Sequence, residues 1–170
     1  ADNTRWLNPV TGEADDWFEL FNLSTNQPVY LEGCTLTDKP AKTNRFTIPP
    51  GVVIPPRGFL RVWADDAQTN FFTDGELHVP FKLEKSGESL ALFSPWGELV
   101  DAVIFGRQTE NVSQGRWRDG ADTIIAMTNA TPGGRNFPDD WPACAAPPPV
   151  QIMPSAGAGV TLWFALPDCP

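Results

Sequence analysis

The sequence predicts an all-β fold, a sandwich of two sheets, and three observations favour it. Apolar and polar residues alternate over short runs, which is the period of a strand with one buried face. The 18 Pro and 14 Gly residues separate these runs with turns. No run carries apolar residues at the spacing of a helix that packs on a core. Eight or so short strands at such intervals are typical of a β-sandwich.

The first two predicted strands each present one apolar face. In the first, Phe18 and Leu20 point the same way, because side chains alternate along a strand. In the second, Cys34 and Leu36 share the buried face, and Gly33 marks a bulge or a close approach of another backbone. We therefore expect both strands to lie on the core with one face.

The next strands are separated by proline-rich turns. Phe46 and Ile48 lead into a turn at residues 49–51, where Pro sets φ and Gly frees it. Residues 59–63 are apolar at both parities, which predicts a central strand that is covered on both faces. Trp63, at the end of this run, is predicted to close one end of the core.

Residues 77–83 alternate cleanly, with His78 on the polar parity, so His78 is predicted to face solvent. Pro80 cannot donate a ladder hydrogen bond, which confines this run to an edge strand or a bulge. Residues 94–97 read as a hairpin turn into a further strand over residues 98–105.

The predicted sandwich spans residues 15–136, after an N-terminal loop over residues 1–14. Its predicted core consists of Phe18, Leu20, Leu36, Phe46, Ile48, Leu60, Val62, Leu83, Leu90 and Leu92. These residues occupy the apolar parity of their strands, and alternation and turn chemistry agree on the assignment.

Residues 137–170 differ in composition from the sandwich. They combine a Pro- and Ala-rich linker with a short alternating strand at residues 160–166, which is too short to fold alone. This strand is either the start of a truncated next module or a strand that docks back onto the sandwich. Cys144 and Cys169 bracket it, and we expect them to form a disulfide that leaves Cys34 as a buried free thiol.

Charge and hydropathy exclude two classes of partner. A net charge of −9 and a pI near 4.4 oppose nucleic-acid binding, which needs clustered Lys and Arg. No apolar run approaches the roughly 20 residues that span a bilayer.

The opening residues lack the basic and apolar regions of a signal peptide, so either a signal was removed or the chain was cut from a longer protein. The acidic composition favours a secreted, periplasmic or cell-surface location.

Catalytic and metal chemistry have little support. His78 is the only histidine, so any catalytic triad must use it, and we predict neither catalysis nor a buried titratable pair around it. Calcium is the one candidate cofactor, because Asp65, Asp66 and Asp74 supply hard oxygen ligands from loops. Their spacing matches no EF-hand, and solvated loop acids are the simpler explanation.

Tryptophans are the candidate ligand contacts. The chain has seven Trp against one Tyr, with Trp96 at the predicted hairpin tip, Trp117 in a later loop and Trp6 near the start. An exposed indole can stack on a sugar ring or on a partner's side chain. The expected partner is therefore a protein or a polysaccharide.

Several fragments, in this order and spacing, resemble the lamin tail domain, an immunoglobulin-like module of nuclear lamins that recurs in bacterial secreted proteins. The fragments are residues 17–22, 36–38, 48–64, 81–92, 100–101, 113–116 and 131–136. The resemblance implies an immunoglobulin-like β-sandwich without shared catalytic residues. Family members usually begin with an apolar strand ahead of Asp2 and Asn3, which this chain begins too late to contain. We therefore expect an open sheet edge, which residues 160–166 could cover.

The sequence thus predicts a non-catalytic binding or scaffold module of a larger exported, bacterial-type protein, in contact with neighbouring domains of its parent chain. A carbohydrate-binding module of an extracellular hydrolase is the first alternative, and an exposed Trp pair along one sheet face would favour it. A metal-dependent hydrolase is the second. Glu19 and Asn22 are expected to have structural roles, bonding loop N–H groups near a strand end.

Overall fold

The computed structural model describes residues 1–42, 46–69 and 71–138, and these residues form strands and loops but no helix. The strands are β1 (Asp16–Phe21), β2 (Val29–Tyr30), β3 (Thr35–Thr37), β4 (Phe46–Thr47), β5 (Val53–Ile54), β6 (Phe59–Ala64), β7 (Phe72–Thr73), β8 (Glu76–His78), β9 (Glu88–Phe93), β10 (Leu99–Phe105), β11 (Ser113–Arg116) and β12 (Ile124–Met127). Within these ranges there is no helix of the length and apolarity needed to cross a membrane. The all-β prediction is confirmed.

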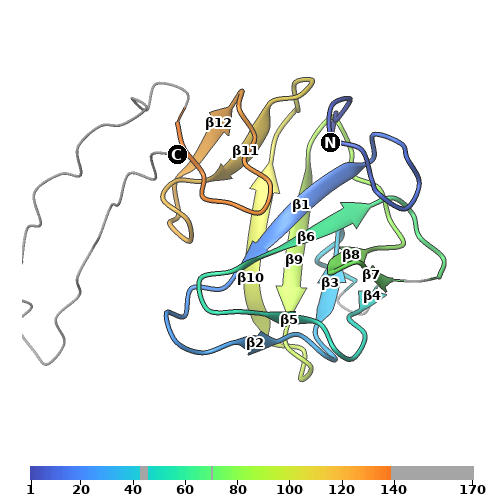
Figure 1. Cartoon of the computed structure of the whole chain (residues 1–170), viewed down its shortest axis with the longest axis vertical. Helices are drawn as coiled ribbons and strands as arrows, with labels where there is room; N and C mark the ends of the chain where they lie inside the picture. The colour runs from blue at the N-terminus through green and yellow to red at the C-terminus, as the bar shows by residue number, and fades with distance from the viewer. Residues whose placement is uncertain (43–45, 70, 139–170) are drawn as a thin grey trace, which may run out of the picture.

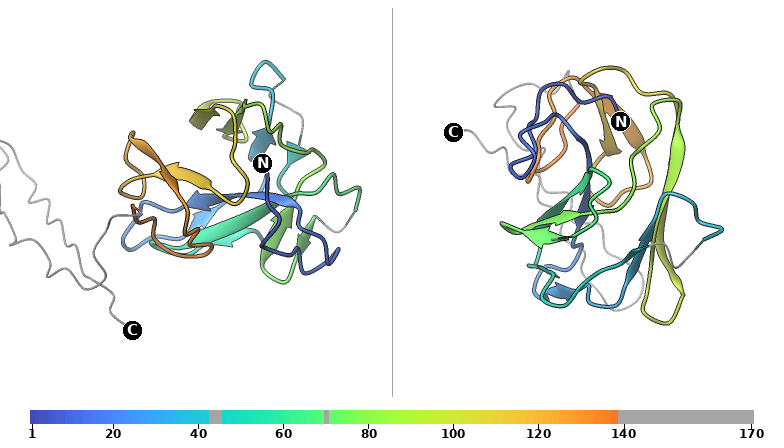
Figure 2. Two further views of the ribbon diagram at one scale, coloured as in Figure 1. Left: turned by 90° about the horizontal axis from the view of Figure 1, so that it is seen from above. Right: turned by 90° about the vertical axis from the view of Figure 1, so that its right-hand side faces the viewer.

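Two four-stranded sheets form the layers of the sandwich (Figure 1, Figure 2). One has the strand order β1-β6-β8-β7 and the other β10-β9-β3-β4. β1 pairs antiparallel with β6 and β9 with β10, whereas β6 and β8 run parallel. Two-stranded ladders, β2–β5 and β11–β12, complete the architecture. Consequently β1 and β10 are each the end strand of a sheet.

The core lies between the layers, and the sequence identified most of it. Seven of the predicted core residues are buried: Leu36, Phe46, Ile48, Leu60, Val62, Leu83 and Leu90. Phe18, Leu20 and Leu92 are half-buried and pack against this cluster. Trp63 is fully buried, as predicted, and its indole N–H donates to Glu76 Oε2 at 2.5 Å. The core is therefore complete around β3, β6 and β8 and less complete beside β1.

The strand predicted for residues 77–83 is shorter than expected. β8 ends at His78, before Pro80, which has no N–H to donate to a ladder. Leu77 and Val79 are buried as the alternation predicted, but His78 is buried too. The prediction of an edge strand is wrong, because the proline lies beyond the paired residues and β8 sits between β6 and β7.

The turn between β9 and β10 forms as predicted. The Ser94 N–H donates to the Glu98 carbonyl at 2.8 Å, and the Gly97 N–H donates to the Ser94 carbonyl at 2.9 Å. Gly97 has φ of 84°, a conformation that costs glycine little. Gly87 has φ of 113°, and a Cβ there would lie 2.8 Å from the Phe105 carbonyl oxygen. Glycine therefore lets this loop approach the end of β10.

Asn22 follows β1 and joins three segments. Its buried Nδ2 donates to the carbonyls of Gln27 at 2.8 Å, Ile54 at 3.1 Å and Pro55 at 3.1 Å. Its Oδ1 accepts the Ser24 N–H at 2.9 Å. The predicted structural role is confirmed, although most of its partners are carbonyl groups rather than N–H groups.

Candidate functional site

A cavity of about 840 Å³ opens between the two sheets where β1 and β10 end them. This volume falls within the range of roughly 300–1,000 Å³ that is usual for ligand sites. Apolar side chains from both sheets line it, among them Phe18, Leu20, Leu36, Leu90, Val103 and Phe105. The cavity is thus continuous with the sandwich core.

The remaining wall comes from outside the two sheets. Residues of β11, β12 and the segment 130–136 line the cavity together with β1 and β10. In Figure 1 the β11–β12 hairpin lies beside one end of β10. The hairpin and the 130–136 segment therefore bridge the gap that the two sheet edges leave.

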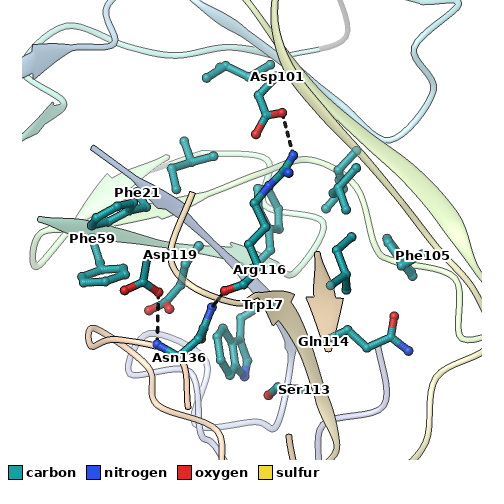
Figure 3. Close-up of a pocket in the computed structure, with 18 of the residues that line it drawn as sticks. Trp17, Phe21, Phe59, Asp101, Phe105, Ser113, Gln114, Arg116, Asp119 and Asn136 are labelled. Atoms are coloured by element: carbon teal, nitrogen blue, oxygen red, sulfur yellow. Dashed lines mark hydrogen bonds and ion pairs between the residues drawn. The ribbon is translucent and has the colours of Figure 1, made fainter. Parts of the chain in front are cut away.

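Arg116 fastens the β11–β12 hairpin to β10 (Figure 3). Its Nη2 donates to Asp101 Oδ1 at 2.8 Å and to the Ala102 carbonyl at 3.3 Å. Its Nη1 donates to the Ala121 carbonyl at 3.0 Å, within the hairpin itself. A guanidinium suits this position, because its planar fork serves several acceptors at once.

Asn136 and Glu19 fasten the segment 131–136 on its two sides. Asn136 Nδ2 donates to the Arg116 carbonyl at 3.1 Å, and the Asn136 N–H donates to Asp119 Oδ1 at 3.1 Å (Figure 3). On the β1 side, the Gly133 N–H donates to Glu19 Oε1 at 2.5 Å. The structural role predicted for Glu19 is confirmed, and the segment spans from β11 to β1.

Two carboxyl groups at this wall hold their protons more tightly than usual. Burial raises the pKa of Glu19 to about 7, and the Gly133 N–H and Arg61 offset this only in part. Burial also raises the pKa of Asp119. Glu19 therefore changes charge near neutral pH at the cavity wall. The Glu19 carboxyl group already accepts the structural hydrogen bond from the Gly133 N–H. His78, the single histidine of the chain, does not line the cavity.

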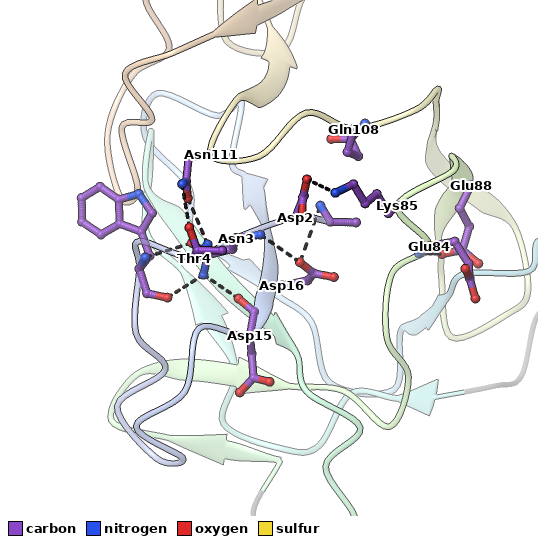
Figure 4. Close-up of polar contacts among 12 residues, drawn as sticks. Asp2, Asn3, Thr4, Asp15, Asp16, Glu84, Lys85, Glu88, Gln108 and Asn111 are labelled. Carbon is purple, nitrogen blue, oxygen red and sulfur yellow. Dashed lines mark hydrogen bonds and ion pairs between the residues drawn. The ribbon is translucent and has the colours of Figure 1, made fainter.

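N-terminal residues line part of the cavity and are held by polar contacts, which Figure 4 shows. Asp2 Oδ2 lies 2.6 Å from Lys85 Nζ, in the loop before β9. The Thr4 N–H donates to Asn111 Oδ1 at 3.0 Å, and Asn111 Nδ2 donates to Thr4 Oγ1 at 2.7 Å. Asn3 Nδ2 donates to the Asp15 carbonyl at 2.7 Å. The start of the chain is thereby tied to both sheets.

Comparison with known families agrees with this architecture. The family model described as Lamin Tail Domain matches residues 6–107, more than half of the chain. The chain belongs to the lamin tail domain family. A search of curated proteins returned no match. Lamin tail domains are immunoglobulin-like and generally non-catalytic modules, and the strands found here fit that fold. The match ends shortly after β10, so the β11–β12 wall of the cavity lies beyond it.

This lamin tail domain contains a buried histidine–carboxylate pair. His78 Nδ1 lies 2.6 Å from Asp65 Oδ2, and the two side chains are 2% and 4% exposed. Asn8 Nδ2 donates to the same Asp65 oxygen at 2.9 Å. The predictions that His78 faces solvent and that no buried titratable pair surrounds it are wrong. Asp65 directly follows β6, the parallel neighbour of β8, and this pairing brings the carboxylate to the histidine.

The pair is not positioned for chemistry on a ligand. His78 Nε2 is enclosed and has no hydrogen-bond partner among the described residues. Neither His78 nor Asp65 lines the cavity. A catalytic dyad needs its second ring nitrogen within reach of a nucleophile or substrate. The geometry supports a structural role.

The calcium candidates do not converge on one site. Asp65 is committed to His78 and Asn8, whereas Asp66 and Asp74 are exposed. Asp66 has φ of 59° and Asp74 has φ of 53°, in the left-handed region that aspartate tolerates in turns. Within the described ranges, no three His, Cys, Asp or Glu side chains are grouped to hold a metal ion.

The three tryptophan candidates lie in different surroundings. Trp96, in the β9–β10 turn, is 85% exposed. Trp117 is half-buried, and its ring centroid lies 6.0 Å from that of Phe137. Trp6 is half-buried and lines the cavity. The β9–β10 turn lies at the opposite end of β10 from the β11–β12 hairpin (Figure 1), so these indoles do not form one platform.

Of the three cysteines, Cys34 lies in the part of the chain that the structure describes. Cys34 is a buried free thiol, as predicted, and it lines the cavity. Burial raises the pKa of this thiol above its ordinary value. Cys144, Cys169 and the strand predicted at residues 160–166 lie outside the described residues.

Sequence reasoning missed the polar wall of the cavity. Arg116 and Asn136 lie in two of the fragments that resemble the lamin tail domain, and this resemblance was the only sequence signal that pointed to them. Their partners are distant in the chain: Asp101 lies 15 positions before Arg116, and Asn136 lies 20 positions after it. No local periodicity connects such residues, so the contacts emerge only when the strands are placed.

Proposed function

We propose that this lamin tail domain is a non-catalytic binding module that docks a protein partner on the β9–β10 hairpin. The exposure of large apolar side chains on this hairpin carries the proposal: Trp96 is 85% exposed, Ile104 79%, Leu99 60% and Val100 57%. Single exposed apolar residues are ordinary on protein surfaces, but a group on one element indicates an interaction site. We call these four residues the hairpin strip.

Leu99 and Ile104 belong to one face of β10. Leu99 lies opposite Phe93 and Ile104 lies opposite Ser89, two β9 residues that are four positions apart and so point the same way. A bulge in β10 produces this alignment, because five positions separate the two residues on β10 itself. Leu99 and Ile104 of the hairpin strip therefore share one face of β10, whereas Val100, at the bulge, also lines the cavity.

We also propose that the module belongs to a larger exported protein of bacterial type and contacts its neighbouring domains. The net charge of −9 supports this, since a strongly acidic surface keeps an extracellular module soluble and apart from other acidic surfaces. Apolar contacts then provide the attraction, which suits a partner that the hairpin strip meets in a fixed orientation.

A polysaccharide is the alternative ligand, and the exposure of Trp96 favours it. A sugar chain usually needs a flat platform, whereas Trp6 and Trp117 are half-buried elsewhere. Leu99 and Ile104 offer no hydrogen bonds to hydroxyl groups. The chemistry of the strip therefore favours a protein surface over a carbohydrate.

Photocrosslinking from the strip tests this proposal. A photoreactive phenylalanine analogue replaces Ile104 in one variant and Tyr30 in a control, because Tyr30 is 72% exposed but lies on β2. Both full-length variants are displayed on the producing cells and irradiated. We expect discrete protein adducts from position 104 only, and at least tenfold fewer when Trp96→Ser is added.

Two results would contradict the proposal. Adducts of equal yield from positions 104 and 30 would show non-specific contact. Retention of the wild type on an insoluble polysaccharide, lost in Trp96→Ser but kept in Ile104→Ser, would establish the carbohydrate alternative instead.

A further inference from the structure

Two sheet edges face the cavity without a strand between them. β1 ends one sheet and β10 ends the other, and both line the cavity. In the part of the chain that the structure describes, β1 pairs only with β6 and β10 only with β9. Each edge presents backbone N–H and C=O groups that can pair with an added strand, apart from Ala102 of β10, whose N–H donates to Asp101 Oδ1 and whose carbonyl accepts from Arg116 Nη2.

The composition of β10 is that of an interior strand. Six of its seven residues, Leu-Val-Asp-Ala-Val-Ile-Phe, are apolar. Such continuous apolar runs are typical of strands that are covered on both faces. Yet Val100 is 57% exposed and Ile104 is 79% exposed. The strand is more apolar than its position at a sheet edge requires.

The lining of the cavity favours an extended chain as occupant. Leu20 and Val103 line it from opposite sheets, and both are half-buried beside a volume of about 840 Å³. An occupant must supply apolar side chains to this interior and backbone groups to the two edges. A strand with one apolar face supplies both, as in β-strand addition.

We propose that residues 160–166 of this chain insert as a strand between β1 and β10. Val160, Leu162, Phe164 and Leu166 alternate, so an extended backbone points all four into the cavity. The seven residues span about 23 Å when extended, the same length as the seven residues of β10. None of the seven is charged, so burial removes no charge from water.

The position of the linker makes this insertion possible within one molecule. Asn136 lines the cavity and lies two residues before the end of the described chain. The 22 positions from residue 138 to residue 160 reach up to about 70 Å. A return to the cavity needs only part of that reach. Prolines at positions 147–149 stiffen the linker and lower the entropy that docking removes.

Hydrogen exchange of the full chain tests the insertion. We call the gap between the edges of β1 and β10 the slot. The slot-breaking variant carries Leu162→Asp and Phe164→Asp, which put charges on the face of the strand that would enter this gap. A matched control carries Ala156→Asp and Ala158→Asp, which add the same charge to the same tail outside the strand. We expect the free-edge amides of β1 and β10 to exchange at least tenfold faster in the slot-breaking variant than in the wild type, and the control to stay within twofold of the wild type.

Alkylation of Cys34 provides a second readout. This thiol lines the cavity, so an inserted strand shields it from reagent. Site-resolved mass spectrometry separates Cys34 from Cys144 and Cys169. We expect iodoacetamide to modify Cys34 at least tenfold faster in the slot-breaking variant, with the control unchanged.

Three outcomes would overturn the proposal. Free-edge amides of the wild type could exchange as fast as exposed loop amides. The slot-breaking variant and the control could behave alike in both readouts. A concentration-dependent dimer that requires Leu162 and Phe164, seen by light scattering, would place the strand in a second copy instead. Each is distinct from failure of the hairpin strip, which is tested at Ile104 and Trp96.

Discussion

Two sides of the same sandwich bury their apolar residues to different extents. Around β3, β6 and β8, Leu36 is 1% exposed and Val62 and Leu77 are 0% exposed. Beside β1 and β10, Phe18 and Leu20 are half-buried around a cavity of about 840 Å³. β10 on the open side has six apolar residues of seven, whereas β3 and β8 on the closed side each have one of three, so apolar composition alone does not close a core.

The difference lies in the number of neighbours that each strand has. β6 lies between β1 and β8, so strands flank it on both edges. β10 pairs with β9 on one edge only, and among the described residues no strand pairs with its other edge, which the β11–β12 hairpin contacts through the Arg116 side chain. Backbone pairing holds neighbouring strands in register, so that their side chains interdigitate at close packing. Where that pairing stops, the two layers separate and a cavity remains.

The largest expected effect contrasts equivalent truncations on the two sides. Leu77→Ala should lower the free energy of unfolding by about 3–4 kcal/mol, because it leaves a cavity in the closed core. Leu20→Ala should lower it by only about 1–2 kcal/mol, because that side chain is half-buried beside an existing cavity. Urea denaturation of both full-length variants measures the two losses. Losses of equal size would break the comparison.

A smaller effect concerns the buried pair on the closed side. Asp65→Asn should destabilise by about 2 kcal/mol, since hydrogen bonds to a charged acceptor contribute more than those to a neutral one. Asp66→Asn is the control, because that neighbour is exposed and Asn tolerates its positive φ; it should change stability by less than about 0.5 kcal/mol. Thermal unfolding at constant pH compares the two variants. Equal stabilities would mean that the buried pair contributes nothing.

The smallest expected effect depends on pH and reports on the open side. Glu19 has a folded pKa of about 7, above its ordinary value of 4.5, so the folded state binds the proton more tightly than the unfolded chain. Its contribution to stability is therefore greatest below pH 4.5, falls as pH rises from 4.5 to 7, and stays low above pH 7.

Glu19→Gln tests that contribution, because glutamine stays neutral and can still accept the Gly133 N–H. We expect the variant to match the wild type near pH 4 and to exceed its unfolding free energy by about 1–2 kcal/mol at pH 8. The exposed Glu98→Gln serves as control. A variant less stable than the wild type at pH 8 would show that the carboxylate itself holds the 131–136 segment to β1.

Sequence reasoning succeeded where the relevant partners are near in the chain or share a simple period. Alternation located the core positions Leu36 and Val62, and turn chemistry located the hairpin at Gly97. It failed at His78, whose parity predicted exposure, because the ring is buried and bonded to Asp65, 13 positions earlier in the chain, which alternation does not report. Period-two patterns report one face of a strand and not what later covers the other face.

By itself the sequence determined the all-β class, the membership in the lamin tail domain family, most of the core and the buried thiol of Cys34. These follow from local alternation, turn residues and ordered fragments. Only the tertiary structure decided the parallel pairing of β6 with β8, the buried His78–Asp65 pair and the cavity between β1 and β10. Such features depend on which strands become neighbours, and that choice rests on backbone pairing and packing between residues far apart in the chain.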